Sequence, residues 1–94
     1  MYILVNHSIN MPAQFWGAAQ KYLTTLPEAG VKRVVSIFPS DNMDQCTTIW
    51  EADSTESLDR YLQNKIGNTG KYSYYRINEA NAVGLNEIKM PFMK

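Results

Sequence analysis

The stretch QCTTIWEADSTESLDRYLQNKIG, residues 45–67, carries most of the information about the fold. Its first part, Gln45 to Ala52, is rich in β-branched and aromatic residues, as strands are. Its last part repeats large apolar residues at helical spacing, at Leu58, Tyr61, Leu62 and Ile66. Between the two, Asp53 to Glu56 reads as a capping box with Asp53 as the N-cap, and Gly67 is expected to end the helix in a left-handed conformation. The stretch therefore predicts a strand that leads directly into a helix.

The residues before this stretch show the same alternation. Tyr2 to His7 and Val31 to Phe38 are β-branched and aromatic runs, which predict the first and second strands. Between them, Asn10 can cap a helix whose apolar stripe continues to Leu26. Pro39 to Asn42 has turn chemistry, so the second and third strands are expected to form a hairpin.

The residues after it add one more strand, predicted over Tyr72 to Ile77. Strand, helix, strand, strand, helix, strand is the split βαβ order. It predicts an α+β fold, a ferredoxin-like βαββαβ sandwich in which two helices cover one face of a four-stranded antiparallel sheet. We expect a single domain over residues 1–94, with its core in 1–80. Residues 81–94 are apolar enough to pack on that core or on a partner subunit.

The strands carry apolar residues on both faces. In the first strand, Ile3 and Val5 alternate with Tyr2 and Leu4. A sheet with one face in water would alternate apolar with polar residues instead. We therefore expect a second copy of the chain to cover the open face, which predicts a homodimer.

Composition excludes several classes of function. Lys+Arg and Asp+Glu balance at nine each, so the chain lacks the basic field that favours a nucleic acid or an anionic membrane as partner. Cys46 is the only cysteine, which rules out an intrachain disulfide. The N-terminal residues lack the pattern of a signal peptide, and no apolar run approaches the roughly 20 residues that span a bilayer. A cytoplasmic protein is expected.

The chain resembles the dimeric α/β-barrel superfamily, and within it small uncharacterised bacterial proteins. The resemblance rests on Cys46 to Ala52, Ser54 to Leu58, Lys71 to Ile77 and Ala82 to Leu85. It implies two sheets packed face to face, a shape that hosts quinone-forming monooxygenases, haem-degrading enzymes, lactone isomerases and metal-binding proteins. Haem-degrading members need an axial histidine in the second half of the chain, where this sequence has none, so no haem is expected.

The candidate ligand-binding residues come from the ends of the strands. In this topology the first and third strands are expected to lie parallel and adjacent, so their carboxyl ends meet. Asn6 and His7 then lie near Trp50 and Glu51, and Arg33 and Tyr74 (or Tyr72) share the same rim; which side chains face the cleft is not fixed by the pattern. His7 suits acid–base chemistry near neutral pH, with Glu51 to orient it. The alternative is a histidine that is only hydrogen-bonded or hydrated.

The other candidates also have two interpretations each. Trp50 and the tyrosines of residues 72–75 either stack a planar ligand or fill the core or the dimer interface. Arg33 and Arg76 either hold a carboxylate or pair across the sheet. His7 with Glu51 and Asp53 is too small a set for a metal site, so neither a metal nor a cofactor is expected.

Two functions follow from these features, and no catalytic residue is assigned. The first is a homodimer that binds a small apolar or aromatic molecule between sheet and helices, with cofactor-free monooxygenase or isomerase activity as one outcome. The alternative is a non-catalytic structural, interaction or metal-binding dimer whose barrel is filled by its own side chains. An internal space of a few hundred Å³ would favour the first.

Overall fold

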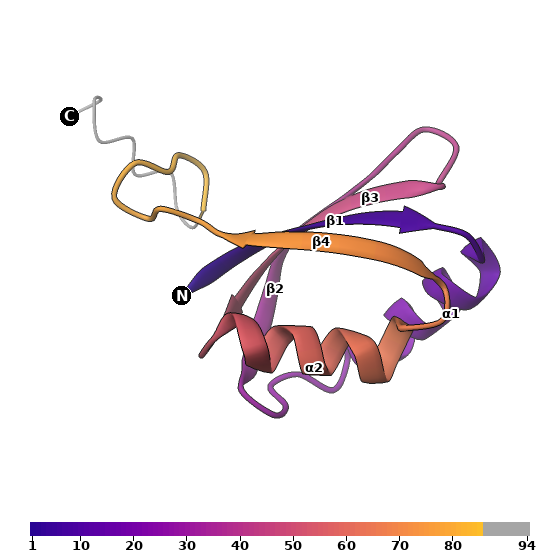
Figure 1. The fold of residues 1–94 in the computed structure, drawn as a ribbon, viewed down its shortest axis with the longest axis horizontal. Helices are drawn as coiled ribbons and strands as arrows, with labels where there is room; N and C mark the ends of the chain where they lie inside the picture. Colours follow the sequence, from indigo (N-terminus) through magenta and orange to yellow (C-terminus); the bar gives the residue numbers. More distant parts are fainter. Residues whose placement is uncertain (86–94) are drawn as a thin grey trace.

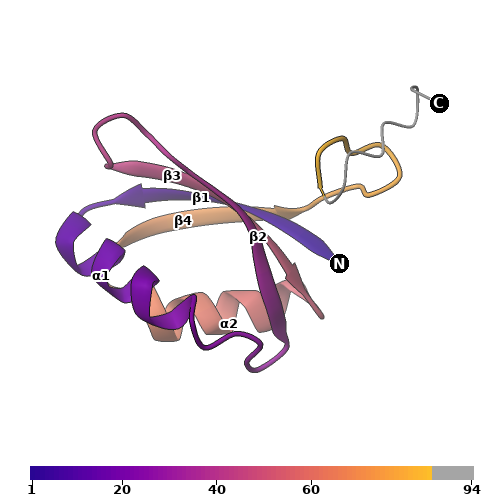
Figure 2. The ribbon, with the colours of Figure 1, turned by 180° about the vertical axis from the view of Figure 1, so that it is seen from behind.

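The computed structural model describes residues 1–85, in which strands and helices follow each other in the predicted order. The strands form one sheet in the order β2-β3-β1-β4, and every neighbouring pair is antiparallel. Both helices cover the same face, and no described element covers the other (Figures 1 and 2). The predicted ferredoxin-like βαββαβ sandwich is confirmed. Its elements are β1 (Tyr2–Ile9), α1 (Pro12–Tyr22), β2 (Val31–Pro39), β3 (Gln45–Ala52), α2 (Thr55–Ile66) and β4 (Gly70–Arg76).

Strand alternation decides which side chains enter the core. In β1 the buried residues are every second one, Ile3, Val5, His7 and Ile9, and in β3 they are Cys46, Thr48, Trp50 and Ala52. Successive side chains of a strand point to opposite faces, so both sets face the helices. The helices contribute the opposite wall of the core, which is Phe15, Ala19, Tyr22, Leu58, Tyr61, Leu62 and Ile66.

Helix α1 begins and ends differently from the prediction. Its N-cap is Met11, and no side chain caps it, so the predicted capping by Asn10 is wrong. The helix ends at Tyr22 although the apolar stripe continues to Leu26. The hydroxyls of Thr24 and Thr25 donate to the carbonyls of Lys21 (2.7 Å) and Tyr22 (2.9 Å), which satisfies terminal acceptors that another turn of helix would have used.

Helix α2 also differs at both ends. Ser54, not Asp53, is the N-cap, and its hydroxyl accepts a hydrogen bond from the backbone N–H of Ser57 at 3.0 Å. Gly67 follows the helix with φ −54°, so it does not adopt the predicted left-handed conformation. At Gly70, three residues further on, a Cβ would collide with the backbone carbonyl of Ser8. This close approach lets β4 start alongside the end of β1.

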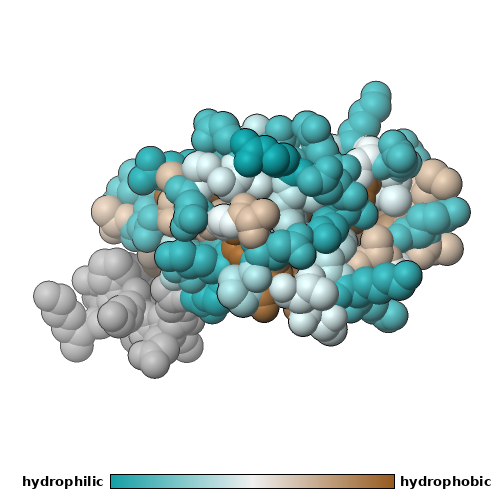
Figure 3. Space-filling view, turned by 90° about the horizontal axis from the view of Figure 1, so that it is seen from below, coloured by the Kyte–Doolittle hydropathy of each residue, from teal (hydrophilic) through white to brown (hydrophobic). Residues whose placement is uncertain are grey.

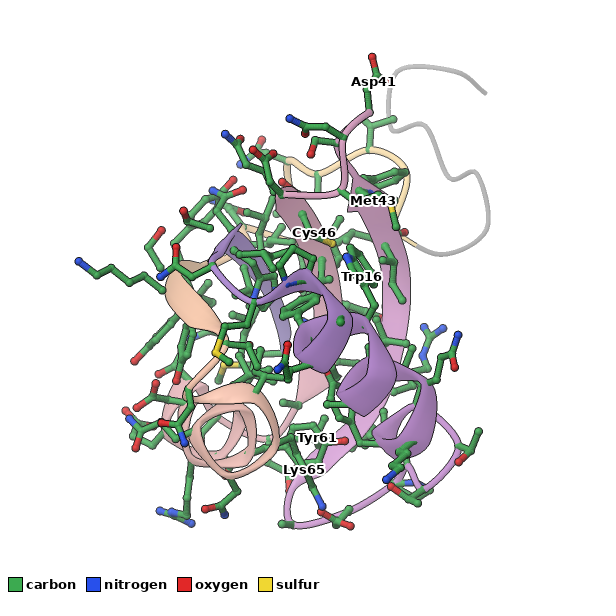
Figure 4. The ribbon with its side chains drawn as sticks, turned by 90° about the vertical axis from the view of Figure 1, so that its right-hand side faces the viewer. Trp16, Asp41, Met43, Cys46, Tyr61 and Lys65 are labelled. Atoms are coloured by element: carbon green, nitrogen blue, oxygen red, sulfur yellow. The ribbon has the colours of Figure 1, made fainter. Side chains whose placement is uncertain are left out.

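The hairpin between β2 and β3 is tied to α1. Trp16 of α1 lies beside the loop that carries Met43, close to Cys46 of β3 (Figure 4). The indole N–H of Trp16 donates to the Met43 carbonyl at 3.2 Å. Met43 itself has a positive φ of 66°. The hairpin and α1 therefore hold each other in place.

Two further predictions concern the ends and surroundings of the chain. Residues 77–85 form a loop beyond β4, in which Val83 is 49% exposed (Figure 1). The rest of the predicted C-terminal extension, residues 86–94, lies outside the described residues, so its packing stays a prediction. Within residues 1–85 no helix has the length and apolar character needed to cross a membrane.

Candidate functional site

His7 is the chemically most distinctive residue of the sheet. It lies near the end of β1 on the face that the helices cover, and only 5% of it is exposed. Its ring packs edge-on against Phe15 of α1, with 5.2 Å between centroids, and lies 6.1 Å from the ring of Tyr72 on β4. Burial lowers the pKa of His7 from 6.5 to about 4. At neutral pH the imidazole is therefore uncharged and a weak base.

Thr48 joins His7 to Trp50. The Thr48 hydroxyl oxygen lies 3.0 Å from Nε2 of His7 and 2.6 Å from Nε1 of Trp50, and all three residues are buried. Trp50 donates its N–H, because an indole nitrogen has no acceptor function. The three side chains form a polar chain across the sheet inside an otherwise apolar core. Thr48 was missed from the sequence because an isolated threonine in a strand carries no signal beyond β propensity.

Tyr72 lies directly opposite His7 in the sheet and continues the polar contacts to α2. Its hydroxyl donates to the carboxylate of Asp59 at 2.8 Å. Burial, together with this bond to Asp59, raises the pKa of Tyr72, so the phenol stays protonated. The ring of Tyr72 also lies 6.4 Å from that of Tyr74, which is 39% exposed. Tyrosine rings therefore line the edge of the sheet beside α2.

Among the hollows formed by residues 1–85, three lie at this end of β4, and Lys71 and Tyr72 line each of them. The first is a narrow crevice between sheet and helices, too tight to hold a water molecule, with His7, Phe15 and Ile66 among its walls. The second is an open groove of about 650 Å³ between α2 and β4, which includes Asp59 and Tyr74. The third is an open groove of about 410 Å³ on the uncovered face, with Asn6 and Gln45. The crevice at His7 therefore adjoins two grooves that are open to solvent.

The predicted arrangement of the site residues was wrong in one respect. β1 and β3 are antiparallel neighbours, not parallel ones, so their carboxyl ends lie at opposite ends of the pairing. Asn6 lies opposite Thr47, whereas Glu51 lies opposite Tyr2. The split βαβ order places β3 between two parallel strands and forces it to run against both. His7 and Glu51 therefore cannot act together.

The six predicted residues divide between the two faces of the sheet. His7, Trp50 and Tyr74 are on the helix side, and Asn6, Arg33 and Glu51 are on the open side. Arg33 donates to Glu51 at 2.8 Å, and this hydrogen bond lowers the pKa of Glu51, so the carboxylate is engaged in a cross-strand ion pair. Asn6 accepts a hydrogen bond from the Thr47 hydroxyl at 2.7 Å. The structure therefore brings together two pairs of the six residues, Arg33 with Glu51 directly and His7 with Trp50 through Thr48.

Trp50 is a core residue. It is 1% exposed, and its ring lies 5.9 Å from Tyr61 and 6.4 Å from Tyr22. Lys65 places its ammonium 5.6 Å from the Tyr61 ring, and Figure 4 shows both on α2 at the lower end of the helix layer. Aromatic side chains thus fill the middle of the layer between sheet and helices. The walls of the crevice at His7 do not include Trp50.

A pH dependence follows from the burial of His7. Above pH 6.5 the imidazole is mainly neutral in both the native and the unfolded state, so it adds little pH dependence to the free energy of unfolding. As the pH falls below 6.5, the unfolded state binds a proton that the native state accepts only near pH 4, so the free energy of unfolding decreases. We expect a loss of about 2 kcal/mol between pH 6.5 and pH 5. Urea unfolding at these two pH values measures it.

The variant His7→Gln isolates the contribution of the histidine. Carboxylates titrate equally in both proteins, so the difference between the two slopes belongs to His7. We expect the variant to lose most of the decrease in stability between pH 6.5 and pH 5. Equal slopes for the two proteins would show that His7 is protonated as easily in the native state as in the unfolded chain.

The fold and this site define the class of protein: a ferredoxin-like βαββαβ domain with a buried polar chain at one end of its sheet. No family model matches the sequence, and no curated protein matches it. Solved structures do match. One is a candidate antibiotic biosynthesis monooxygenase from Nitrosomonas europaea, at 15% identity and a TM-score of 0.53, covering 83% of this chain and 99% of that one.

A second similar structure is Rv0793 from Mycobacterium tuberculosis. It has 11% identity and a TM-score of 0.52, and the match covers 81% of this chain and 93% of that one. Both matches span nearly the whole of the other chain, so the described fold corresponds to their complete domain. Identities this low show the fold alone. The resemblance to dimeric α/β-barrel proteins is thereby confirmed at the level of the fold.

Proposed function

We propose that the protein is a cytoplasmic homodimer that binds a small aromatic or largely apolar molecule in the groove between helix α2 and strand β4. The observation that carries this proposal is the open groove of about 650 Å³, which Tyr72 and Tyr74 line. Ligand sites are mostly apolar hollows with a few polar groups that fix orientation. Asp59 and Lys71 supply such polar groups in this groove.

The size of the hollows determines how a ligand fits. The crevice at His7 has no room for a water molecule, so it takes up no part of a ligand. The adjoining groove between α2 and β4, at about 650 Å³, is within the size range of small-molecule pockets. A ligand places its ring in this groove against Tyr72 and Tyr74. This differs from the sequence expectation, which included Trp50 among the ligand-binding residues.

The uncovered face of the sheet supports the homodimer. Its central residues Leu4 and Ile49 lie opposite each other, and Tyr75 and Phe38 on the flanking strands are 56% and 60% exposed. The outward side of the helices, by contrast, presents mainly hydrophilic residues (Figure 3). A second copy stacked on the sheet would bury this apolar band, and a domain of this size gains from the added burial.

For the activity we propose cofactor-free oxygenation, since the name of the Nitrosomonas europaea protein gives monooxygenase as its reaction class. If the substrate carries an activated ring CH₂ group, the reaction balances without another reductant. One atom of O₂ becomes the new carbonyl oxygen, the other leaves as water, and the four electrons come from the substrate carbon. If the CH₂ group lost a proton without reacting with O₂, the reaction would be an isomerisation. Oxygen uptake with substrates of this type tests the activity separately from binding.

The alternative function has an observation of its own. Tyr22, Trp50 and Tyr61 occupy the middle of the layer between sheet and helices. A barrel filled in this way fits a non-catalytic structural or interaction dimer. Residues 1–85 contain no group of three or more histidine, cysteine, aspartate and glutamate side chains placed to hold a metal. Binding at the groove separates the two functions.

The variant Tyr74→Ala tests the groove. We use 1-indanone, a two-ring aromatic ketone, as the probe, and measure its Kd by titration calorimetry. Tyr74 is 39% exposed, so its loss should leave the fold intact while it removes one aromatic wall. An aromatic contact contributes about 0.5–1.5 kcal/mol, so the Kd should rise about 3- to 10-fold.

The matched control is Met11→Ala. Met11 is a similarly exposed hydrophobic residue, at 41%, and lines none of the three hollows. Its substitution should leave the Kd for 1-indanone unchanged. If both variants bind the probe as the native protein does, the groove between α2 and β4 is not the binding site.

A further inference from the structure

The carboxylate of Asp59 is held in place by uncharged groups. Asp59 belongs to α2 and lines the groove between α2 and β4. The Tyr72 hydroxyl donates to its Oδ1 at 2.8 Å, and the side-chain amide of Gln63 donates to its Oδ2 at 3.2 Å. No cation of residues 1–85 forms an ion pair with it. Each carboxylate oxygen can accept a second hydrogen bond, so Asp59 offers a fixed negative charge to a ligand.

Two tyrosine rings lie beside this carboxylate. Tyr72 and Tyr74 are two positions apart in β4, so both side chains leave the sheet on the helix side. Their ring centroids are 6.4 Å apart, with 32° between the ring planes, and both residues line the groove. The face of a tyrosine ring attracts a cation, as a carboxylate does. The groove therefore combines three groups that favour a positive charge.

The backbone of β4 adds hydrogen-bond acceptors to the same wall. β4 is an edge strand, which pairs with β1 on one side only. The N–H of Ile77 donates to the carbonyl of Tyr2, in line with the register of these two strands. Bonded and non-bonded pairs alternate along an antiparallel ladder, so the odd-numbered residues of β4 bond to β1. The N–H and C=O groups of Tyr72 and Tyr74 therefore point outward, and within residues 1–85 they have no hydrogen-bond partner.

The positively charged residue of the groove, Lys71, points away from this wall. It pairs with Ser8 in the sheet, and successive side chains of a strand alternate between the two faces. The Lys71 side chain therefore leaves β4 on the uncovered face, whereas the two tyrosines leave it on the helix side. Lys71 also lines the groove on the uncovered face, in keeping with this direction. Asp59 is thus the charged side chain on the same side of the sheet as the two rings.

We propose that the ligand of this groove is an aromatic amine in its protonated form, with the ammonium group on Asp59 and the ring against Tyr72 and Tyr74. The inference rests on the proposed function, because it names the ligand class for the same groove. An alkylammonium group has three hydrogens to donate. The carboxylate accepts one, and the outward carbonyls of β4 are acceptors for the others. A hydrogen bond between two charged groups is about twice as strong as one between neutral groups, so Asp59 selects the amine.

The ligand class is tested with 2-phenylethylamine and 2-phenylethanol, which share a ring and a two-carbon chain and differ in the charged group. Both are titrated at pH 7, where an alkylamine is protonated. We expect the Kd of the amine to be about 5- to 10-fold lower than that of the alcohol. Equal Kd values would overturn the ligand class but leave the groove as a binding site. Failure of both probes to bind would overturn the proposed function, and the ligand class with it.

A third probe, 3-phenylpropionate, carries a carboxylate on the same ring and chain. We expect it to bind more weakly than the alcohol, because Asp59 repels it. If it binds more tightly than the amine, and Lys71→Gln removes that preference, the groove selects anions through Lys71 and the inference is wrong.

The variant Asp59→Asn removes the charge and keeps an acceptor for the Tyr72 hydroxyl, so the fold should be unchanged. We expect the Kd of the amine to rise about 5- to 10-fold, to the value for the alcohol, whose own Kd stays the same. Asp41→Asn is the matched control, because Asp41 is exposed in the β2–β3 loop and lines none of the three hollows (Figure 4). Amine binding that is unchanged in Asp59→Asn, or weakened equally by both variants, would overturn the inference.

Discussion

Replacing Trp50 by alanine is expected to lower the free energy of unfolding by about 3–5 kcal/mol. Trp50 is 1% exposed and packs against the rings of Tyr22 and Tyr61. Its removal leaves a large cavity, and the Thr48 hydroxyl loses a hydrogen bond. Small domains have total stabilities of this order, so the variant should be largely unfolded at 37 °C. Circular dichroism against urea concentration measures the change.

Trp16→Ala is the matched control, because it removes the chain's other tryptophan. Trp16 is only half-buried, and its indole N–H donates to the Met43 carbonyl at an exposed position. We expect a loss of about 1 kcal/mol, from the hydrogen bond and the contact with Phe15. Equal losses for both variants would contradict the assignment of Trp50 to the core. Trp50→Ala with native stability but weaker probe binding would return Trp50 to the ligand site.

The second large effect is expected from Ile49→Arg on the uncovered face of the sheet. Ile49 is half-buried, lies opposite Leu4 and forms part of the central apolar band. In a face-to-face dimer the new charge would be buried without a partner, which costs about 3–5 kcal/mol. The Kd of the dimer should rise at least 100-fold. Sedimentation velocity at micromolar concentration should show the monomer.

Gln20→Arg adds the same charge to the exposed side of α1 and is the control. It should sediment as the native protein does. Both variants should keep a native circular dichroism spectrum, because neither side chain is in the core. If Ile49→Arg sediments as a dimer, the copies do not meet through this face of the sheet.

The fold was predictable because its local signals agree with one another. β3 matches its predicted range, Gln45 to Ala52, and the strand-to-helix transition of residues 45–67 is present. The errors lie at the helix ends, where short polar side chains compete for the same backbone groups. Ser54 caps α2 although Asp53 precedes it, and Thr24 and Thr25 end α1 before its apolar stripe does. Sequence pattern alone does not decide such competitions.

The site was less predictable because it depends on pairing between distant strands. His7 was identified from its chemistry alone, as the single histidine. Its partners were not, because Thr48 is 41 positions away in sequence and Tyr72 is on another strand. The direction of β3 reversed the expected neighbours and separated Glu51 from His7. A residue such as Thr48 acquires a role only when pairing places it between two other polar groups.

The central claim is a homodimer with a small-molecule site at one end of each sheet. Native mass spectrometry of freshly purified, untagged protein tests it most directly. We expect the mass of two chains of 10.7 kDa each, and a further shift of one or two ligand masses after addition of 1-indanone. A single chain with no adduct, at concentrations where the protein is folded, would contradict the account.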